Sequence, residues 1–149
     1  MAFAPDALTP LGGYPGDETK ARELFVNLDQ TKTKEDFVAA AQCLVSRADC
    51  AGKIGVVGFC YGGSKSFTLA AAVPFYGNMP PASDALLIKA PLQIHFAEVD
   101  ERINAAWPAY EQALRTAGVS YSAYQYPGTQ HGFNNEALMN FTWVAQREG

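Results

Sequence analysis

The chain has few of the residues that bind metals or form disulfide bonds. Its 149 residues include two histidines and three cysteines, and these show no paired C-x-x-C or H-x-x-x-H spacing. The sequence therefore predicts neither a metal site nor a cofactor. Three cysteines do not make a disulfide framework, although Cys43 and Cys50 could pair in an exported protein. We expect both to be structural thiols, because neither lies in a glycine-flanked turn that would expose and activate it.

Long apolar runs and clustered positive charge are missing as well. No run approaches the roughly 18 apolar residues of a membrane span, and no signal peptide precedes Phe3. The net charge is -4 and the lysines and arginines are scattered, so we expect neither a nucleic-acid partner nor a membrane partner. The composition indicates a soluble, cytoplasmic protein with one domain over residues 1–149. An exported location would follow if an upstream signal is missing from this chain.

The most informative segment present is KIGVVGFCYGG, residues 53–63. The short β-branched run at residues 54–57 predicts a fully buried strand that ends in a tight, glycine-rich turn. Cys60 lies at the centre of a G-x-C-x-G-G pattern, where a nucleophile elbow packs too closely for flanking side chains, and Gly58 and Gly62 meet that need. A thiol there would face the N-terminus of the next helix, which favours the thiolate. The alternative is a buried structural cysteine.

An acid and a histidine follow further along the chain, each just after a predicted strand. Residues 91–96 (PLQIHF) read as a buried strand and precede Asp100, while residues 120–126 read as a strand near a sheet edge and precede His131. Nucleophile, acid and histidine is the order of the α/β-hydrolase triad. Because catalytic groups collect beyond the carboxyl ends of parallel strands, we expect Cys60, Asp100 and His131 to meet.

Two features of this pattern have plainer interpretations. Glu98 and Glu101 share the loop with Asp100, and only one carboxylate could orient an imidazole; an acidic loop is usually a solvated one. His95 lies within an apolar strand, where a packed or hydrogen-bonded core histidine is the expected role. We therefore assign no catalytic part to His95.

The segments FAPD, GFCYGG, AEVDERIN and PGTQHGFNNE together resemble the dienelactone hydrolase family of α/β-hydrolases, over roughly residues 1–135. The resemblance implies that Cys60 is the nucleophile, Asp100 the triad acid and His131 the triad histidine. It implies acyl transfer through a thioester, with Asp100 fixing the imidazole tautomer and the backbone N–H of Tyr61 donating to the oxyanion. The small-molecule substrate would be an ester or a lactone.

The sequence departs from the family pattern at the positions that are implied to bind the substrate. The arginines with which the family is implied to hold a substrate carboxylate are replaced by Pro10 and Asn135, so a bidentate clamp is missing. Dienelactone itself is therefore a doubtful substrate, and a neutral or differently anchored ester or lactone is as plausible. Tyr76, Asn78 and Trp107 are candidate substrate contacts, with core packing as the alternative for each.

The resemblance implies a partial α/β-hydrolase fold, a mainly parallel sheet flanked by helices that lacks the N-terminal strands. FAPD would be the fourth strand, and the loop with the second oxyanion donor would be absent. Only YGGSKSFTLA separates Cys60 from the next strand, AAVPFYG, which is short for a parallel crossover. A homodimer or a complementing chain could rebuild the sheet. Two functions stay open: a cysteine-dependent hydrolase, and a catalytically inactive remnant that serves as an interaction or scaffold module.

Helical periodicity completes the α/β pattern. Apolar residues recur at helical spacing over residues 17–29 and 34–46, which predicts two surface helices that cover a sheet, with Thr33 as the cap of the second. A further helix is predicted from about Asn104 to residue 117, ending at Gly118. The tail, residues 136–149, has an amphipathic helical pattern.

Overall fold

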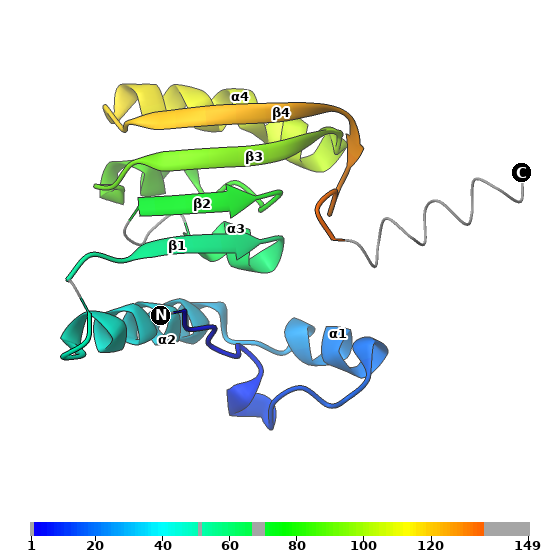
Figure 1. The fold of residues 1–149 in the computed structure, drawn as a ribbon. Helices are drawn as coiled ribbons and strands as arrows, with labels where there is room; N and C mark the ends of the chain where they lie inside the picture. The colour runs from blue at the N-terminus through cyan, green and yellow to red at the C-terminus, as the bar shows by residue number, and fades with distance from the viewer. Residues whose placement is uncertain (1, 51, 67–70, 136–149) are drawn as a thin grey trace, which may run out of the picture. The chain divides into compact units, whose positions relative to one another are not determined.

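The computed structural model describes residues 2–50, 52–66 and 71–135 (Figure 1). The chain separates into two compact units, residues 1–54 and residues 55–149. The single domain predicted over residues 1–149 stays a prediction. The amphipathic helix predicted within residues 136–149 lies outside the described residues. No helix in the described part of the chain is long and apolar enough to cross a membrane.

The first unit is helical in its described residues. It contains a 3-10 turn, η1 (Thr9–Leu11), and two helices, α1 (Glu18–Val26) and α2 (Gln30–Ser46). Both predicted helices are confirmed, whereas their packing over a sheet stays a prediction. The segment FAPD, residues 3–6, forms no strand, so the expectation that it is the fourth strand of the fold is wrong. A strand needs a hydrogen-bonded neighbour, and Pro5 has no N–H to offer one.

Aspartate side chains cap both helices of this unit. Asp17 accepts a backbone N–H at the start of α1 at 2.9 Å, and Asp29 accepts the N–H groups of Thr31 and Lys32 at 2.9 and 3.0 Å. The predicted cap at Thr33 is therefore wrong, because α2 begins a turn earlier. Thr33 lies inside the helix, and its hydroxyl donates to the Asp29 carbonyl at 2.8 Å. Aspartate is at least as good an N-cap as threonine, so the earlier capping residue prevails.

The second unit contains a four-stranded sheet. Its strands are β1 (Gly55–Phe59), β2 (Ala71–Phe75), β3 (Leu92–Val99) and β4 (Tyr121–Gln130), in the order β1-β2-β3-β4. Every neighbouring pair is parallel (Figure 1). Each strand overlaps a run that the sequence predicts to be a strand, but β3 and β4 extend beyond the predicted ends at residues 96 and 126, to Val99 and Gln130. The α/β class with a parallel sheet and flanking helices is therefore confirmed.

Three helical segments connect these strands. They are α3 (Tyr61–Ser66), η2 (Ala82–Leu87) and α4 (Glu101–Thr116). The crossover from β1 to β2 contains only the six residues of α3 as described helix, yet the two strands pair in parallel along their whole length. Helix α4 begins at Glu101, earlier than the predicted Asn104, and it is followed by Gly118 with a left-handed φ of 67°, as expected.

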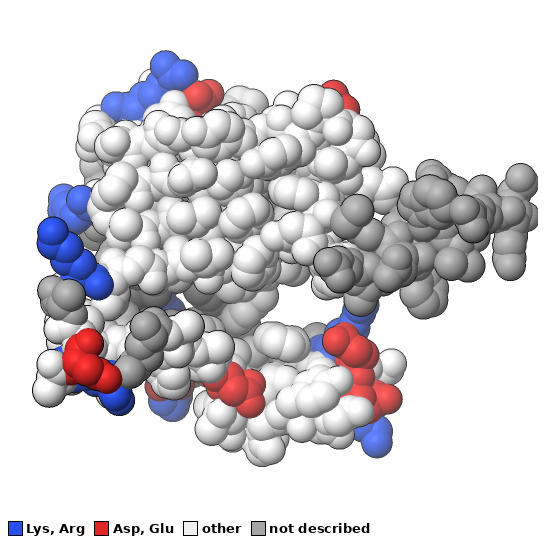
Figure 2. All heavy atoms as spheres, viewed as in Figure 1, with Lys and Arg blue, Asp and Glu red and all other residues white. Residues whose placement is uncertain are grey.

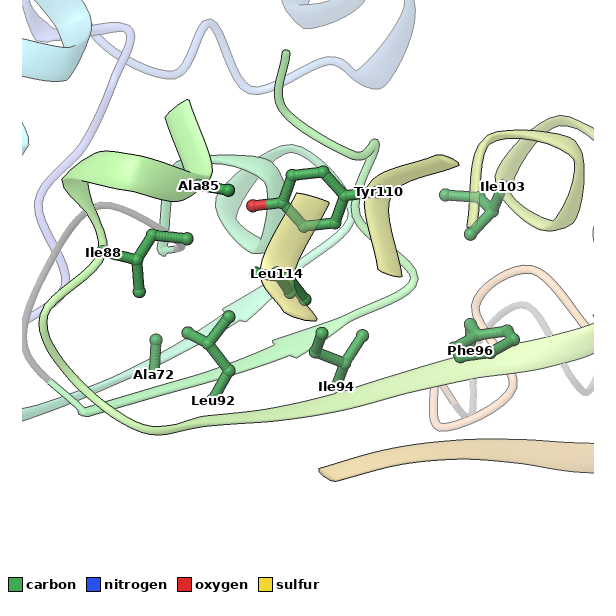
Figure 3. Close-up of a cluster of buried hydrophobic side chains, with 9 residues drawn as sticks. All are labelled: Ala72, Ala85, Ile88, Leu92, Ile94, Phe96, Ile103, Tyr110 and Leu114. Carbon is green, nitrogen blue, oxygen red and sulfur yellow. The ribbon is translucent and has the colours of Figure 1, made fainter. Parts of the chain in front are cut away.

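The hydrophobic core lies between one face of the sheet and the segments α4 and η2. Leu114 and Ile103 of α4 are 0% and 1% exposed and contact side chains from β3. The full cluster is Ala72, Ala85, Ile88, Leu92, Ile94, Phe96, Ile103, Tyr110 and Leu114 (Figure 3). Burying each large aliphatic side chain contributes roughly 1.5–3 kcal/mol. This packing fixes α4, and therefore the loop that begins it, against β3.

Strand β1 is more exposed than the sequence predicts. Val57 and Phe59 are 59% and 49% exposed, so the expectation of a fully buried strand is wrong. Gly58 faces α3, so the alternating side chains of Val57 and Phe59 lie on the opposite face of β1, which hydrogen-bonds to β2 alone among the described strands. In the view of Figure 2 the surface over the strands carries almost no charged side chains. An apolar run thus marks a strand without establishing that the strand is central.

Candidate active site

Cys60 occupies a sharp turn between β1 and α3. Its φ is 50°, a left-handed conformation that is uncommon for a residue with a side chain. The Cys60 N–H donates to the Phe75 carbonyl at 3.0 Å, and the Cys60 carbonyl accepts the N–H of Ser64 at 3.1 Å. These bonds anchor the turn to β2 on one side and to α3 on the other. The side chain of Cys60 is exposed, as a nucleophile requires and a buried structural thiol would not be.

The turn is possible because two glycines allow its backbone segments to meet. A Cβ at Gly58 would lie 2.2 Å from the Gly62 carbonyl oxygen, and one at Gly63 would lie 2.8 Å from that of Phe75. The prediction that Gly58 is required for close approach is confirmed. The same prediction for Gly62 is wrong, since a Cβ there would meet no atom within 4 Å. Gly62 points outward from α3, and Gly63 faces the sheet instead.

The structure brings Cys60, Asp100 and His131 into contact. The His131 Nδ1 lies 2.6 Å from Asp100 Oδ2, and the His131 Nε2 lies 3.4 Å from Cys60 Sγ. The Asp100 side chain is 7% exposed and that of His131 is 34% exposed. With Nδ1–H donating to the carboxylate, the Nε2 lone pair faces the thiol. Cys60, Asp100 and His131 directly follow β1, β3 and β4, so all three lie at the carboxyl edge of the sheet, as the sequence predicts.

The acidic loop predicted after residue 96 is wrong for two of its three carboxylates, because Glu98 lies in β3 and Glu101 begins α4, which leaves only Asp100 between the two elements. Glu98 accepts the backbone N–H of Gly128 through Oε2 at 2.7 Å and so joins the end of β3 to β4. Glu101 is exposed in the first turn of α4. Asp100 caps α4 by accepting the N–H of Ile103 at 3.4 Å with Oδ1, while its Oδ2 reaches the imidazole. Among the three, Asp100 is therefore the carboxylate that can orient His131.

Tyr76 lies directly beside the triad. Its ring centroid is 5.0 Å from that of His131, and its hydroxyl donates to Asn134 Oδ1. The residue is 5% exposed; burial raises the pKa of its hydroxyl, and negative charge at Cys60 raises it further. Tyr76 is therefore packed beside the triad, as the core-packing alternative expects, and its contact with a substrate stays a prediction. Asn134 is a residue that sequence reasoning missed, because a loop asparagine carries no motif.

Asn78 lies beside the helix that follows the nucleophile. Its backbone N–H donates to Ser64 Oγ at 2.8 Å, and Ser64 Oγ donates in turn to the Cys60 carbonyl at 3.3 Å. The Asn78 side-chain oxygen accepts a hydrogen bond from Arg102 of α4. Arg102 was not singled out by its sequence context. Asn78 is therefore near the site, although its side chain is already engaged by a cation.

Trp107 and Tyr61 have different environments. Trp107 packs against Phe96 and Tyr121 at centroid distances of 5.3 and 6.0 Å, on the edge of the hydrophobic core. The structure thus places Trp107 in the packing of α4 on the sheet, which was the alternative to a substrate contact, and does not bring it to the triad. Tyr61 is the first residue of α3, so its backbone N–H directly follows Cys60.

His95 is a core residue, as the sequence predicts. It is 6% exposed, its Nδ1 lies 2.7 Å from the Tyr126 hydroxyl, and its ring stacks on Phe75 at 4.3 Å. Burial lowers the pKa of His95. Within the described ranges, no three histidine, cysteine, aspartate or glutamate side chains gather as they would around a metal ion.

A parallel sheet that presents a thiol, an imidazole and a carboxylate beyond its carboxyl edge, with the thiol on a left-handed turn into a helix, defines an α/β-hydrolase fold. The sequence model of the dienelactone hydrolase family matches residues 1–146, and the chain belongs to this family.

The chain is similar to two curated proteins and to one solved structure. It is 33% identical over 126 residues to "Putative carboxymethylenebutenolidase" of Saccharolobus solfataricus, covering 78% of this chain and 49% of the relative. It is 32% identical over 156 residues to "Protein usf" of Aquifex pyrophilus, covering 91% and 64%. The crystal structure of dienelactone hydrolase from Anabaena variabilis superposes with a TM-score of 0.59 at 22% identity, covering 80% and 59%. The chain thus spans about half to two thirds of these relatives, and the structural likeness supports the fold.

Proposed function

We propose that the protein is a hydrolase of small carboxylic esters or lactones and that Cys60 is its nucleophile. The observation that carries this proposal is the placement of one imidazole between two partners. His131 reaches Asp100 at 2.6 Å through Nδ1 and Cys60 at 3.4 Å through Nε2. A thiol, a base and an orienting acid in series are the arrangement of nucleophilic acyl transfer. Membership of the dienelactone hydrolase family supports the same reaction class.

The reaction follows from these contacts. Asp100 accepts Nδ1–H and keeps the Nε2 lone pair directed at the thiol, so that His131 takes the Cys60 proton. The thiolate adds to the carbonyl carbon, and the resulting oxyanion accepts a hydrogen bond from the backbone N–H of Tyr61. The tetrahedral intermediate collapses and expels the alkoxide, which takes the proton from the imidazolium. Water then gives a proton to His131 and attacks the thioester, which releases the acid and restores the thiol.

Two positions of the family pattern bear on the charge of the substrate. Pro10 and Asn135 stand where the family resemblance implies arginines that hold a carboxylate. We therefore propose a neutral or differently anchored ester or lactone in preference to dienelactone. Among the predicted contacts near the triad, Asn78 lies beside the nucleophile helix and is the proposed substrate contact.

The first test is hydrolysis of p-nitrophenyl acetate by the purified chain and its Cys60→Ala variant. We expect turnover to fall by at least about a thousandfold in the variant, because removing a triad nucleophile removes the covalent pathway. Cys43→Ala is the matched control, since Cys43 is also an exposed free thiol and thiols react with activated esters. Mass spectrometry of the acylated chain should locate the acetyl group on Cys60.

The outcomes separate the two functions that the sequence leaves open. Turnover lost with Cys60 and kept in Cys43→Ala supports the hydrolase. A parent chain that is folded by circular dichroism yet hydrolyses the ester no faster than Cys60→Ala contradicts it, and favours an inactive interaction or scaffold module. Equal losses in both cysteine variants would trace the signal to nonspecific thiol acylation.

A further inference from the structure

Two non-glycine residues in the described part of the chain have a positive φ. They are Cys60, at 50°, and Tyr76, at 38°. Cys60 follows β1 and Tyr76 follows the neighbouring strand β2, so both unusual conformations lie at the same edge of the sheet. The nucleophile elbow accounts for Cys60. The proposed reaction gives no reason for the conformation of Tyr76, and such backbone persists only where the surroundings fix it.

The backbone of Tyr76 is held against the nucleophile turn. Its N–H donates to the His95 carbonyl at 2.7 Å. The next residue, Gly77, packs directly on α3, because a Cβ there would lie 2.4 Å from the Ser64 nitrogen and 2.5 Å from the Gly63 carbonyl carbon. Gly63 and Ser64 lie in the turn of helix that begins after Cys60. The main chain at residues 76–77 is therefore fixed relative to the thiol.

The side chain of Tyr76 is held by the histidine turn. Residues 131–134 form a turn after β4, closed by a hydrogen bond from the Asn135 N–H to the Gly132 carbonyl at 2.7 Å. The Tyr76 ring lies 5.0 Å from the His131 ring and 5.5 Å from that of Phe133. Its hydroxyl donates to the Asn134 side chain at the far end of the turn. Tyr76 thus touches the turn along its length.

We propose that Tyr76, through its hydrogen bond to Asn134, is a positioning residue that holds His131 at hydrogen-bond distance from Cys60. This proposal rests on the proposed function. The main chain of Tyr76 is tied to the nucleophile helix, and its side chain is tied to the histidine turn. The separation between Sγ and Nε2 is therefore set through Tyr76. Because the phenol is buried and its O–H donates a hydrogen bond to Asn134 Oδ1, it acts on the turn and not on the substrate.

The hydrogen bond can be removed without removing the ring. Tyr76→Phe keeps the contacts with His131 and Phe133 and deletes the hydroxyl; Asn134→Ala deletes the acceptor on an exposed residue and leaves the core untouched. Tyr124→Phe is the matched control, because Tyr124 is a 46% exposed tyrosine on β4. Circular dichroism and melting temperature establish that each variant is folded.

Two readouts distinguish positioning from a merely structural role. The first is the pH profile of Cys60 alkylation by iodoacetamide, which reports the coupling of thiol and imidazole without a substrate. The second is kcat and KM for p-nitrophenyl acetate. We expect Tyr76→Phe and Asn134→Ala to slow Cys60 alkylation at neutral pH, to move its profile toward that of Cys43, and to lower kcat by about 10 to 100-fold with KM little changed. The double variant should be no worse than either single one, since both delete the same bond.

Several results would overturn the proposal. One is a pH profile of Cys60 alkylation in Tyr76→Phe that matches the parent's, and another is an equal change of profile or kcat in Tyr124→Phe. Additive losses of kcat in the double variant would also contradict it. A rise in KM with kcat unchanged would make Tyr76 a substrate contact. If the parent turns over no ester, the alkylation profiles still decide the proposal separately from the proposed function. A parent whose Cys60 alkylation profile equals that of Cys43 overturns both.

Discussion

The close contact at Gly58 permits a quantitative test of the nucleophile turn. In Gly58→Ala the new Cβ would lie 2.2 Å from the Gly62 carbonyl oxygen, 2.4 Å from its carbonyl carbon and 2.7 Å from the Gly63 nitrogen. All three are backbone atoms of α3, so no side-chain rotation relieves the contact. Overpacking a tight site costs typically 1–3 kcal/mol. We expect the upper end, about 3 kcal/mol, because β1 and α3 must move apart.

Gly62→Ala provides the matched control four residues away. A Cβ at Gly62 meets no atom within 4 Å, and the residue lies inside α3. Alanine is favoured over glycine within a helix by up to about 1 kcal/mol. The same substitution should therefore be neutral or stabilising here. The two variants add the same methyl group, but only the one at Gly58 meets backbone atoms.

Thermal unfolding followed by far-UV circular dichroism compares them. A loss of about 3 kcal/mol corresponds to a fall in melting temperature of roughly 10 °C for a chain of this size. We expect that fall for Gly58→Ala and none for Gly62→Ala. Equal melting temperatures for the parent and Gly58→Ala would refute the close approach of β1 and α3. A fall in Gly62→Ala as large as that in Gly58→Ala would refute the assignment of the contact to Gly58.

Two further predictions concern a helix cap and a buried imidazole. Asp29→Ala should lower the free energy of unfolding by about 1 kcal/mol, because Asp29 accepts two N–H groups of α2; urea titration measures it, and Asp29→Asn, which keeps an acceptor, should lose little. Burial lowers the pKa of His95 below its ordinary 6.5, so the unfolded chain takes up this proton more readily than the folded one. The stability that depends on neutral His95 is therefore present above about pH 6.5 and declines as the pH falls. Urea midpoints between pH 7 and pH 5 should fall more steeply in the parent than in His95→Gln, and equal slopes would contradict the prediction.

Local sequence signals predicted the four strands of the sheet, the helices α1, α2 and α4, and the triad contacts. The β-branched run before Gly58 and the glycines after it predict a strand and a turn from neighbouring residues alone. Cys60, Asp100 and His131 each follow a strand. Because the carboxyl ends of parallel strands lie at one edge of the sheet, the three side chains are predicted to lie close together. These inferences depend on neighbours in sequence and on the geometry of one sheet, and the structure places the three side chains accordingly.

Contacts between distant segments could not be predicted in the same way. Gly62 and Gly63 are indistinguishable in sequence, and the approach of Phe75 from β2 decides which one needs to be glycine. The bond between Tyr76 and Asn134 joins residues 58 apart in the chain. The exposure of Val57 depends on which face of β1 meets α3. In each case the missing information is the position of a second segment, which no local pattern contains.

Asp100 makes two hydrogen bonds, and these affect which substitutions the protein could accept if it lost its activity. One oxygen of the carboxylate fastens the first turn of α4 and the other holds the imidazole. A lineage that no longer turned over substrate would still need a side chain here that accepts an N–H of its helix. Position 60 is under the opposite pressure, because its left-handed backbone would be relaxed by glycine once the thiol was unneeded. After a loss of activity in such a protein, we therefore expect substitutions first at residue 60, while residue 100 keeps a capping side chain.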